Sequence, residues 1–412
     1  MSPGAPDWND RHNAGTLPEG IPWDRAEPMP PPSTPAHEEG PPTADPDDPG
    51  PGQDAHEEEA AAVARVAALP WTSPGLDWLT EEPPPRVYLL HDAPDPRVPV
   101  GARGPGMLPR GKVGILAAAG GVGKTYALTG LALALVTGRP WLGHFPTADG
   151  LVRRVALVLG EEDAGEVRRR LYLQGRAMGL GTSDREAVAA GLLVLPGAGL
   201  DRLALTRAEE TGSVRTGFAG ALHAFLEERG PWDAVILDPL ARFAGPDVET
   251  DNAAATRLIQ VLEGFASLPG EPAVLVAHHT RKTSATDPDP SGANSVRGAS
   301  AIVDGARWTA LLVDVPRPPG APSGLPRFVR FVVRKNNYAP PTLDTDGLLL
   351  AHALGGGLRV ATDPERQALE AAADAAKDAR RSGAGGGGRP RGRGNPAADR
   401  AAGDYGEPPG WA

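Results

Sequence analysis

The chain has 412 residues and a formal net charge of −11 at pH 7. Residues 1–70 hold 14 acidic residues and three arginines and so carry all of that charge, which leaves residues 71–412 neutral. The absence of cysteine excludes disulfides, a thiol nucleophile and a thiolate metal site. No apolar run approaches the roughly 18 residues of a membrane span, and the start MSPGAPDWNDRH lacks the basic and apolar regions of a signal peptide. We therefore expect a soluble cytoplasmic protein with no membrane partner.

The composition divides the chain into three parts. Residues 1–75 predict a disordered, acidic, proline-rich tail, because their few Ile, Leu, Val and Phe side chains cannot offset the entropy of ordering. Residues 371–412 include GAGGGGRPRGRG, which is typical of a flexible Gly/Arg-rich tail. The residues between them, 76–370, suffice for one large α/β domain or two small ones.

Within 76–370, short apolar runs alternate with helix-like segments, which predicts a mostly parallel sheet covered by helices. The expected strands are Val113–Ala118, Val155–Leu159, Leu192–Leu195, Ala234–Leu237 and Ala273–Ala277. The expected helices are Lys124–Thr137, Ala164–Gly175, Gly217–Glu228 and Asn252–Ser267. Runs this apolar suit strands that are buried on both faces.

After the fifth strand the pattern changes. Residues 280–296 predict a polar loop too long for an ordinary connection in a compact domain. A short helix follows near Ser300–Gly305. The spacing of the next apolar runs predicts antiparallel strands added to one edge of the sheet, namely Trp308–Val313, Phe328–Arg334 and Leu348–Ala351.

The segment AAGGVGKT, residues 118–125, directly follows one predicted strand and directly precedes one predicted helix. A P-loop needs small residues so that backbone N–H groups can face a phosphate, and the helix N-terminus adds partial positive charge. Lys124 would reach the β- and γ-phosphates of ATP, and the hydroxyl of Thr125 would bind Mg²⁺. The strict pattern has glycine where this chain has Ala118, and the alternative is a glycine-rich turn with an incidental lysine. The predicted cradle residues are Gly120, Gly121, Val122 and Gly123.

Acidic residues end two of the predicted strands. Asp238 ends DAVILD, as the Mg²⁺-binding acid of a Walker B strand does. The alternative for Asp238 is a turn or N-cap residue. Glu161, Glu162 and Asp163 follow VALVL at the strand end where ligand sites form. One of these three acids would orient the attacking water, or all three cap the next helix.

Two histidines, His278 and His279, end the run AVLVAHH. A polar side chain there is suited to sense the γ-phosphate of a bound nucleotide. The alternative is a pair of hydrogen-bonded imidazoles at the sheet edge.

Six segments together resemble a known family. They are MLPRGKVGILAAAGGVGKT, VALVLGEED, VILDPLARF, VLVAHHTRK, SVRGASAIVDGARW and FVRFVVRKNNYAPP. From about Pro105 to Pro340 the chain is similar to the RecA-like hexameric ATPases related to the plasmid replication helicase RepA, and more distantly to DnaB-type replicative helicases. The resemblance implies a RecA-like P-loop core. It covers neither tail.

The resemblance also implies roles for single residues. Glu162 would be the catalytic base, and His279 would couple the γ-phosphate to the loop that follows it. Arg307 matches an arginine finger that enters the neighbouring subunit's site, and Lys335 its companion. Their alternatives are a surface arginine at a strand start and a solvated lysine on an edge strand. Arg242, in PLARF, matches a positioning residue.

The polar loop after His279 lies where RecA-like rings place a DNA-contacting loop. Arg281, Lys282 and Arg297 would contact phosphates without reading sequence. Two aspartates reduce the net positive charge of this loop, and the loop has no aromatic side chain on which a base could stack. The alternative is therefore a flexible solvated loop.

These observations predict an ATP-hydrolysing ring, a hexamer that acts on single-stranded DNA as a replicative helicase of a plasmid, phage or mobile element. Its cofactors would be ATP and Mg²⁺. The first alternative is a RecA-like ATPase in recombination, loading or regulation that does not unwind DNA. The second is an ATP-binding switch with negligible turnover.

Overall fold

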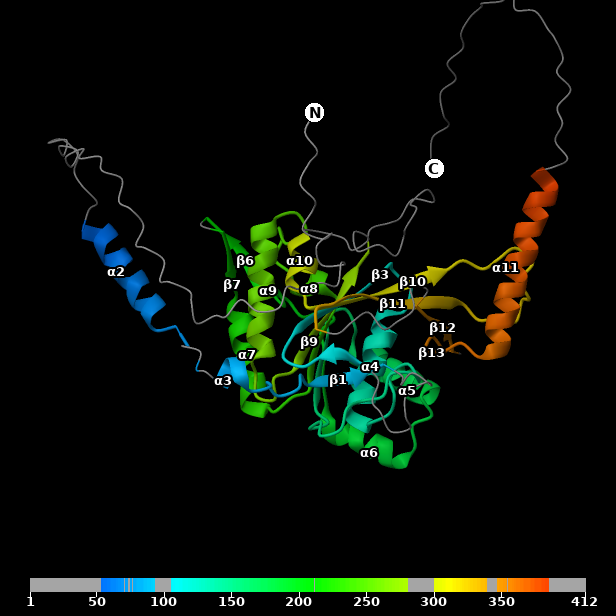
Figure 1. Ribbon diagram of the computed structural model, residues 1–412, viewed down its shortest axis with the longest axis horizontal. Coiled ribbons are helices and arrows are strands. Elements are labelled where there is room, and N and C mark those ends of the chain that lie inside the picture. Colours follow the sequence, from blue (N-terminus) through cyan, green and yellow to red (C-terminus); the bar gives the residue numbers. More distant parts are fainter. Residues whose placement is uncertain are drawn as a thin grey trace, which may run out of the picture. The chain divides into compact units, whose positions relative to one another are not determined.

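The computed structural model describes residues 53–69, 71–72, 75, 77–92, 105–210, 212–280, 300–338, 347–353 and 355–384. The chain divides into two units, Met1–Pro83 and Pro84–Ala412. The first unit contains helices α2 (Gln53–Ala67) and α3 (Asp77–Thr80). The other elements belong to the second unit (Figure 1), which contains the residues of the predicted site.

Two helices lie where the sequence predicts disordered tails. They are α2, and α11 (Asp363–Ala384), which runs past residue 370. Both are rich in Ala, Glu and Arg, which have high helix propensity, and Leu369 and Ala372 of α11 are buried. Helix propensity therefore accounts for these two helices, which the apolar content of the tails does not indicate. Residues 1–52 and 385–412 lie outside the described residues.

The second unit is built on a nine-stranded sheet of order β13-β12-β11-β10-β3-β9-β8-β4-β5. Neighbouring strands are parallel from β10 to β5 and antiparallel from β10 to β13. The parallel strands are β3 (Val113–Ala118), β4 (Val155–Leu159), β5 (Leu192–Pro196), β8 (Ala234–Asp238), β9 (Ala273–His279) and β10 (Trp308–Val315). The others are β11 (Phe328–Asn336), β12 (Leu348–His352) and β13 (Leu358–Val360). The predicted parallel sheet with antiparallel strands toward the C-terminus is confirmed.

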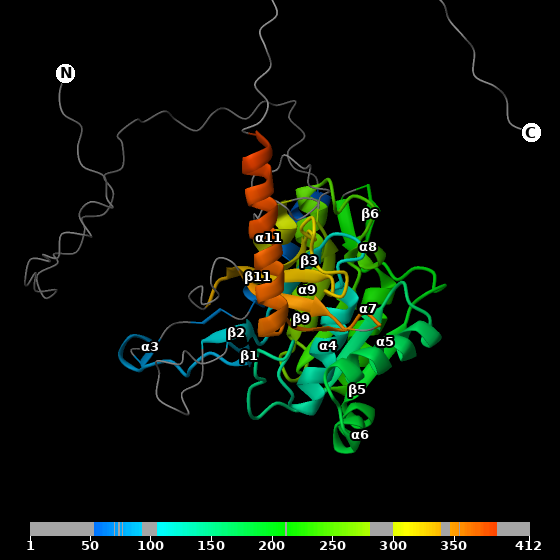
Figure 2. The same cartoon turned by 90° about the vertical axis from the view of Figure 1, so that its right-hand side faces the viewer.

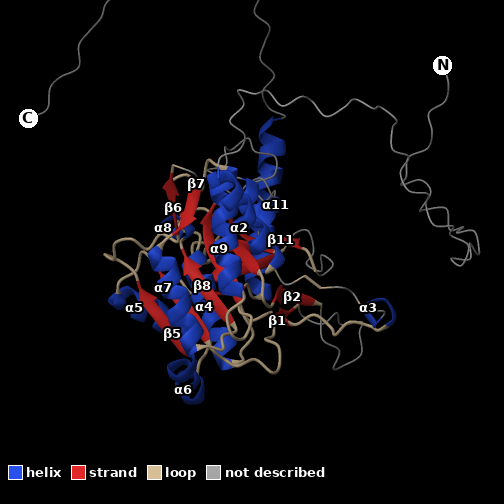
Figure 3. Cartoon of the chain, turned by 90° about the vertical axis from the view of Figure 1, so that its left-hand side faces the viewer, coloured by secondary structure: helices blue, strands red, loops and turns tan. Residues whose placement is uncertain are grey.

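Helices cover both faces of this sheet (Figure 3). They are α4 (Lys124–Thr137), α5 (Ala164–Ala177), α6 (Thr182–Gly191), α7 (Gly217–Arg229), α8 (Leu240–Phe243), α9 (Asn252–Ala266) and α10 (Ser300–Gly305). Two small hairpins complete the unit, β1 (Tyr88–His91) with β2 (Gly106–Pro109) and β6 (Thr206–Glu209) with β7 (Gly212–Arg215). Helix α11 packs at the β11–β12 end of the sheet (Figure 2).

Side chains of the central strands alternate between two apolar cores. In β3, Val113, Ile115 and Ala117 enter the core beneath α7 and α9, whereas Leu116 and Ala118 enter the core beneath α4. This follows from the two-residue period of a strand. Burial on both faces explains why the sequence shows continuous apolar runs instead of alternation.

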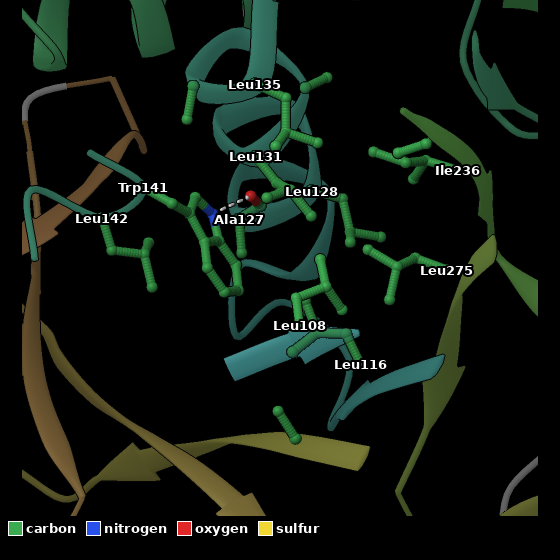
Figure 4. Packing of buried hydrophobic residues seen from close by; sticks show 14 of the residues in the cluster. Leu108, Leu116, Ala127, Leu128, Leu131, Leu135, Trp141, Leu142, Ile236 and Leu275 are labelled. Carbon is green, nitrogen blue, oxygen red and sulfur yellow. Dashed lines mark hydrogen bonds between the residues drawn. The ribbon is translucent and has the colours of Figure 1, made fainter. Parts of the chain in front are cut away.

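Helix α4, which carries the P-loop lysine, is buried nearly all round (Figure 4). Leu128 packs with Leu116 of β3 and Leu275 of β9 in one cluster. On the helix's other side, Trp141 donates a hydrogen bond from Nε1 to the carbonyl oxygen of Ala127 at 2.9 Å. These contacts fix the start of α4 against the sheet, and so they fix the end of the P-loop.

The strand register brings the predicted site residues to one edge of the sheet. Ala118 of β3 is paired with His279 of β9, and Leu159 of β4 with Asp238 of β8. The carboxyl ends of parallel strands therefore place the P-loop, the acids after β4, Asp238 and His279 side by side.

Candidate active site

The P-loop turns from β3 into α4 through glycines that other residues could not replace without strain. Gly121 has φ 73° and Gly123 has φ 115°, both in the region that disfavours side chains. A Cβ on Gly123 would also lie 3.2 Å from Cε1 of His352 and 3.3 Å from Cδ1 of Leu358. The loop thus has its shape because of its own glycines and because strands β12 and β13 pack against it.

Lys124 reaches back across this loop. Its Nζ donates hydrogen bonds to the carbonyl oxygens of Ala118 at 2.9 Å and Ala119 at 3.3 Å. Burial lowers the pKa of Lys124, while the nearby Asp238 and Glu161 raise it. The amine is therefore held by the same loop whose backbone would surround a phosphate group.

Asp238 is buried next to the hydroxyl of Thr125. Burial raises the pKa of Asp238 to about 6, and Glu161 and Glu162 add to that rise, although the hydrogen bond from Thr125 and the charge of Lys124 oppose it. Among the described residues, Oδ2 of Asp238 has no hydrogen-bond partner. A buried carboxylate oxygen without a donor is costly unless another group satisfies it.

This pair fits a magnesium site. Thr125 supplies a hydroxyl and Asp238 supplies an orphaned carboxylate oxygen, and Mg²⁺ prefers such oxygen ligands together with substrate phosphates. No group of three or more His, Asp or Glu suited to a metal occurs in the described part of the chain. Thr125 and Asp238 would hold the ion, which would neutralise charge on the phosphates when bound.

The three acids after β4 separate into different roles. Oδ1 of Asp163 accepts a hydrogen bond from the backbone N–H of Glu166 at 2.8 Å, so Asp163 is the N-cap of α5. Glu162 forms an ion pair with Nη2 of Arg170 at 2.7 Å. Glu161 acts electrostatically on both Lys124 and Asp238. The capping alternative thus holds for Asp163, and Glu161 and Glu162 both lie at the site.

Arg242 holds the turn that carries these acids. Its Nε donates to the carbonyl oxygen of Gly160 at 3.0 Å. A Cβ on Gly160 would lie 2.8 Å from Cβ of Arg242, so the two residues are in close contact. This contact is consistent with the positioning role that the resemblance implied.

His279 is in direct contact with the P-loop lysine. Its Nδ1 lies 3.3 Å from Nζ of Lys124, and an ammonium group can only donate, so Nδ1 is the acceptor. The next residue, Thr280, donates its backbone N–H to the carbonyl oxygen of Ala118 at 3.1 Å. The end of β9 is therefore joined to the phosphate loop, while Arg281, Lys282 and Arg297 lie outside the described residues.

Arg307 and Lys335 lie near the amino ends of the parallel strands. The P-loop of the same chain lies at their carboxyl ends. The backbone N–H of Arg307 bonds to Val113 at the start of β3, whereas the P-loop follows the end of that strand. Four residues of strand separate Gly114 from Ala118, or about 13 Å. The exposed Arg307 side chain is therefore separated from its own phosphate site by the length of β3.

Lys335 binds the end of a short helix. Its Nζ donates to the carbonyl oxygens of Val303 at 3.0 Å and Asp304 at 2.9 Å, in the last turn of α10. Burial lowers the pKa of Lys335, and the charge of Arg307 lowers it further, whereas Asp304 raises it. Arg307 and Lys335 are thus electrostatic neighbours. Lys335 is a helix-capping residue in this structure, not a solvated edge-strand lysine.

Two arginines at the site were not among the sequence predictions. Arg170 pairs with Glu162, and Arg327 donates from Nη1 to the carbonyl oxygen of Gly121 in the P-loop at 2.7 Å. Arg170 lies in α5 and Glu162 precedes that helix, so the i,i+4 spacing of helix pairs does not indicate this contact. Arg327 lies 206 positions from Gly121, and no local pattern connects them.

A family model for an AAA domain, AAA_25, matches residues 77–285 of the chain. The chain belongs to this AAA-domain family. This AAA-domain protein has a P-loop ATPase fold, which implies nucleotide binding. None of its described helices is long and apolar enough to cross a membrane.

Two solved structures are similar to this AAA-domain protein. One is the crystal structure of the RadB recombinase, at 16% identity and TM-score 0.38, covering 61% of this chain and 92% of that chain. The other is the ATPase domain of G40P, at 11% identity and TM-score 0.42, covering 61% of this chain and 86% of that chain. The search of curated proteins found no match.

Proposed function

We propose that this protein is a ring-forming ATPase, a hexamer that moves or unwinds DNA as a RepA-like replicative helicase. The position of Arg307 is the observation that supports the proposal of a ring. Arg307 is exposed at the end of the sheet opposite its own P-loop, which supports a role for it in a neighbouring subunit's site. The similarity of GARW and RKNNY to the RepA-related ATPases supports this assignment.

The site residues have separate roles in this proposal. Lys124 and the P-loop backbone bind the phosphates, and Thr125 with Asp238 holds Mg²⁺. Glu162 accepts the proton of the attacking water, with Arg170 holding its carboxylate. His279 would couple loss of the γ-phosphate to the chain segment that follows it.

Replacing Glu162 by glutamine is expected to lower kcat for ATP hydrolysis by about 10²- to 10⁴-fold, because glutamine keeps the shape but cannot accept the proton. Nucleotide affinity should remain near the wild-type value. Glu161→Gln is the matched control, since that neighbour acts only through its charge on Lys124 and Asp238. A larger loss for Glu161→Gln would assign the base to Glu161.

The same proteins, tested with single-stranded and forked DNA, separate the candidate functions. We expect the wild-type ATPase to be stimulated by single-stranded DNA and to displace an annealed strand, and the Glu162→Gln variant to do neither. Stimulation without displacement would favour an ATPase in recombination, loading or regulation. Nucleotide binding without turnover would favour a switch.

The Arg170–Glu162 pair leads to a smaller prediction. Arg170→Ala should lower kcat by roughly 2- to 5-fold with little change in KM, because partly exposed ion pairs contribute at most about 1 kcal/mol. The adjacent Arg169→Ala is the control, since Arg169 pairs with Glu166 and not with Glu162. Steady-state kinetics on both variants tests this, and equal effects would refute a specific role for Arg170.

A further inference from the structure

Arg327 joins the antiparallel edge of the sheet to the P-loop. It directly precedes β11, and its Nη1 donates to the carbonyl oxygen of Gly121 at 2.7 Å. Its Nε donates to Oδ1 of Asp314 at 2.8 Å. Asp314 lies near the carboxyl end of β10, which the register Leu312↔Ala118 places beside the P-loop. The guanidinium therefore has one partner in the neighbouring strand and one in the loop.

The bond to Gly121 determines the direction of the next N–H group. The carbonyl of Gly121 and the N–H of Val122 belong to one planar trans peptide, so they point in opposite directions. Because Arg327 holds the Gly121 carbonyl, the N–H of Val122 points the other way, toward Ala119 of the same loop. There it makes only a long hydrogen bond, 3.4 Å, to the carbonyl oxygen of Ala119. A phosphate oxygen would be a stronger acceptor for this N–H group.

His352 supports the loop from the same side. Its backbone N–H donates to the carbonyl oxygen of Arg327 at 2.9 Å. Its ring lies against Gly123. Gly123 is thus in contact with strand β12, and Gly121 is held by the residue before β11.

We propose that Arg327 is a positioning residue for the phosphate site, which orients the Gly121–Val122 peptide so that the Val122 N–H faces the β-phosphate of a bound nucleoside di- or triphosphate. This inference rests on the proposed function, because it requires that the P-loop bind a nucleotide. Arg327 acts in its own subunit and from outside the loop. Arg307, in contrast, would act on a neighbour's nucleotide.

If Arg327 only stabilised the fold, its removal would lower the melting temperature and weaken the binding of every ligand alike. Both partners of the Arg327–Asp314 ion pair have side chains that are 47% exposed, and exposed pairs contribute little to stability. Removing Arg327 should therefore leave the melting temperature nearly unchanged. Its effect should fall on ligands that possess a β-phosphate and spare those that lack one.

The test is calorimetric titration of the full-length protein with ADP and with AMP, both with Mg²⁺. Arg327→Ala is expected to weaken ADP binding by roughly 10- to 100-fold, the loss of one well-placed hydrogen bond to a charged group, while AMP affinity is retained. Arg327→Lys should recover part of the ADP affinity, since a lysine can still donate to the Gly121 carbonyl. Asp314→Asn should give a smaller loss.

Arg317→Ala is the matched control. Arg317 precedes β11 in the same hairpin connection, but it donates to the carbonyl oxygens of Leu325 and Pro322 and not to the P-loop. It should bind ADP as the wild type does. Unchanged ADP affinity in Arg327→Ala, or an equal loss for ADP and AMP, would overturn the inference. A wild-type protein that binds neither ADP nor ATP would instead contradict the proposed function.

Discussion

Replacing Arg307 by alanine is expected to lower kcat for ATP hydrolysis by about 10³- to 10⁵-fold, the range for arginine fingers supplied by a neighbouring subunit. The structure provides the physical reason, since Arg307 lies at the edge of the sheet away from its own P-loop. Nucleotide affinity should change much less than kcat. Steady-state hydrolysis and ADP titration on the same preparations measure the two effects.

Mixing experiments distinguish action in trans from a local role. Subunits with Arg307→Ala, mixed with wild-type protein, should inactivate neighbouring sites, while their own sites hydrolyse ATP when a wild-type neighbour supplies the arginine. Subunits with Lys124→Ala keep Arg307 and serve as the comparison. Together, the two inactive variants should recover some activity when mixed. No recovery of activity in that mixture would exclude action in trans, and wild-type activity of Arg307→Ala alone would make Arg307 a surface residue at a strand start.

Replacing Asp238 by asparagine is expected to stabilise the nucleotide-free protein at pH 8 while it abolishes Mg²⁺-dependent hydrolysis. The folded-state pKa of Asp238 is about 6, raised mainly by burial from its ordinary value of 3.8. A carboxyl with a raised pKa is penalised in its ionised form, so stability is lost as the pH rises from about 4 to 6. Above that window the penalty is about 3 kcal/mol, which asparagine would remove.

The pH dependence makes this prediction specific. The stability gained by Asp238→Asn, measured by thermal or urea unfolding, should be largest above pH 6 and shrink toward pH 4. Asp233→Asn is the control at the other end of the same strand. The buried Asp233 carboxylate accepts the backbone N–H groups of Val152 and Arg154, so its replacement should destabilise the protein. A pH-independent gain for Asp238→Asn would refute burial as the cause.

The central fold was predictable because its elements have strong local signals. Strands such as Val155–Leu159 are buried on both faces, so every residue is apolar and the run stands out. The β6–β7 hairpin escaped prediction because its short strands are mostly exposed and have no apolar pattern. Helices α2 and α11 were missed because their signal is helix propensity and not burial.

The predicted site residues lie together in the structure wherever a strand, turn and helix follow one another. The glycines of the P-loop, Lys124 and Thr125 belong to one short segment, and Asp238 ends a buried strand. The parallel register then brings these groups together. Roles that depend on side-chain partners were less predictable, since nothing in the order Glu161, Glu162, Asp163 shows that the last of them caps α5.

The sequence by itself determined the P-loop, the parallel sheet and the acids at its carboxyl edge, because each is written in a few consecutive residues. Only the tertiary structure decided which arginine or lysine side chain contacts which acid or carbonyl group. The pairing of β10 with β3 and β11 places Arg307 at the far edge of the sheet and Arg327 against Gly121. Hydrogen bonds between residues about 200 positions apart depend on strand register, which the local sequence around either residue does not specify.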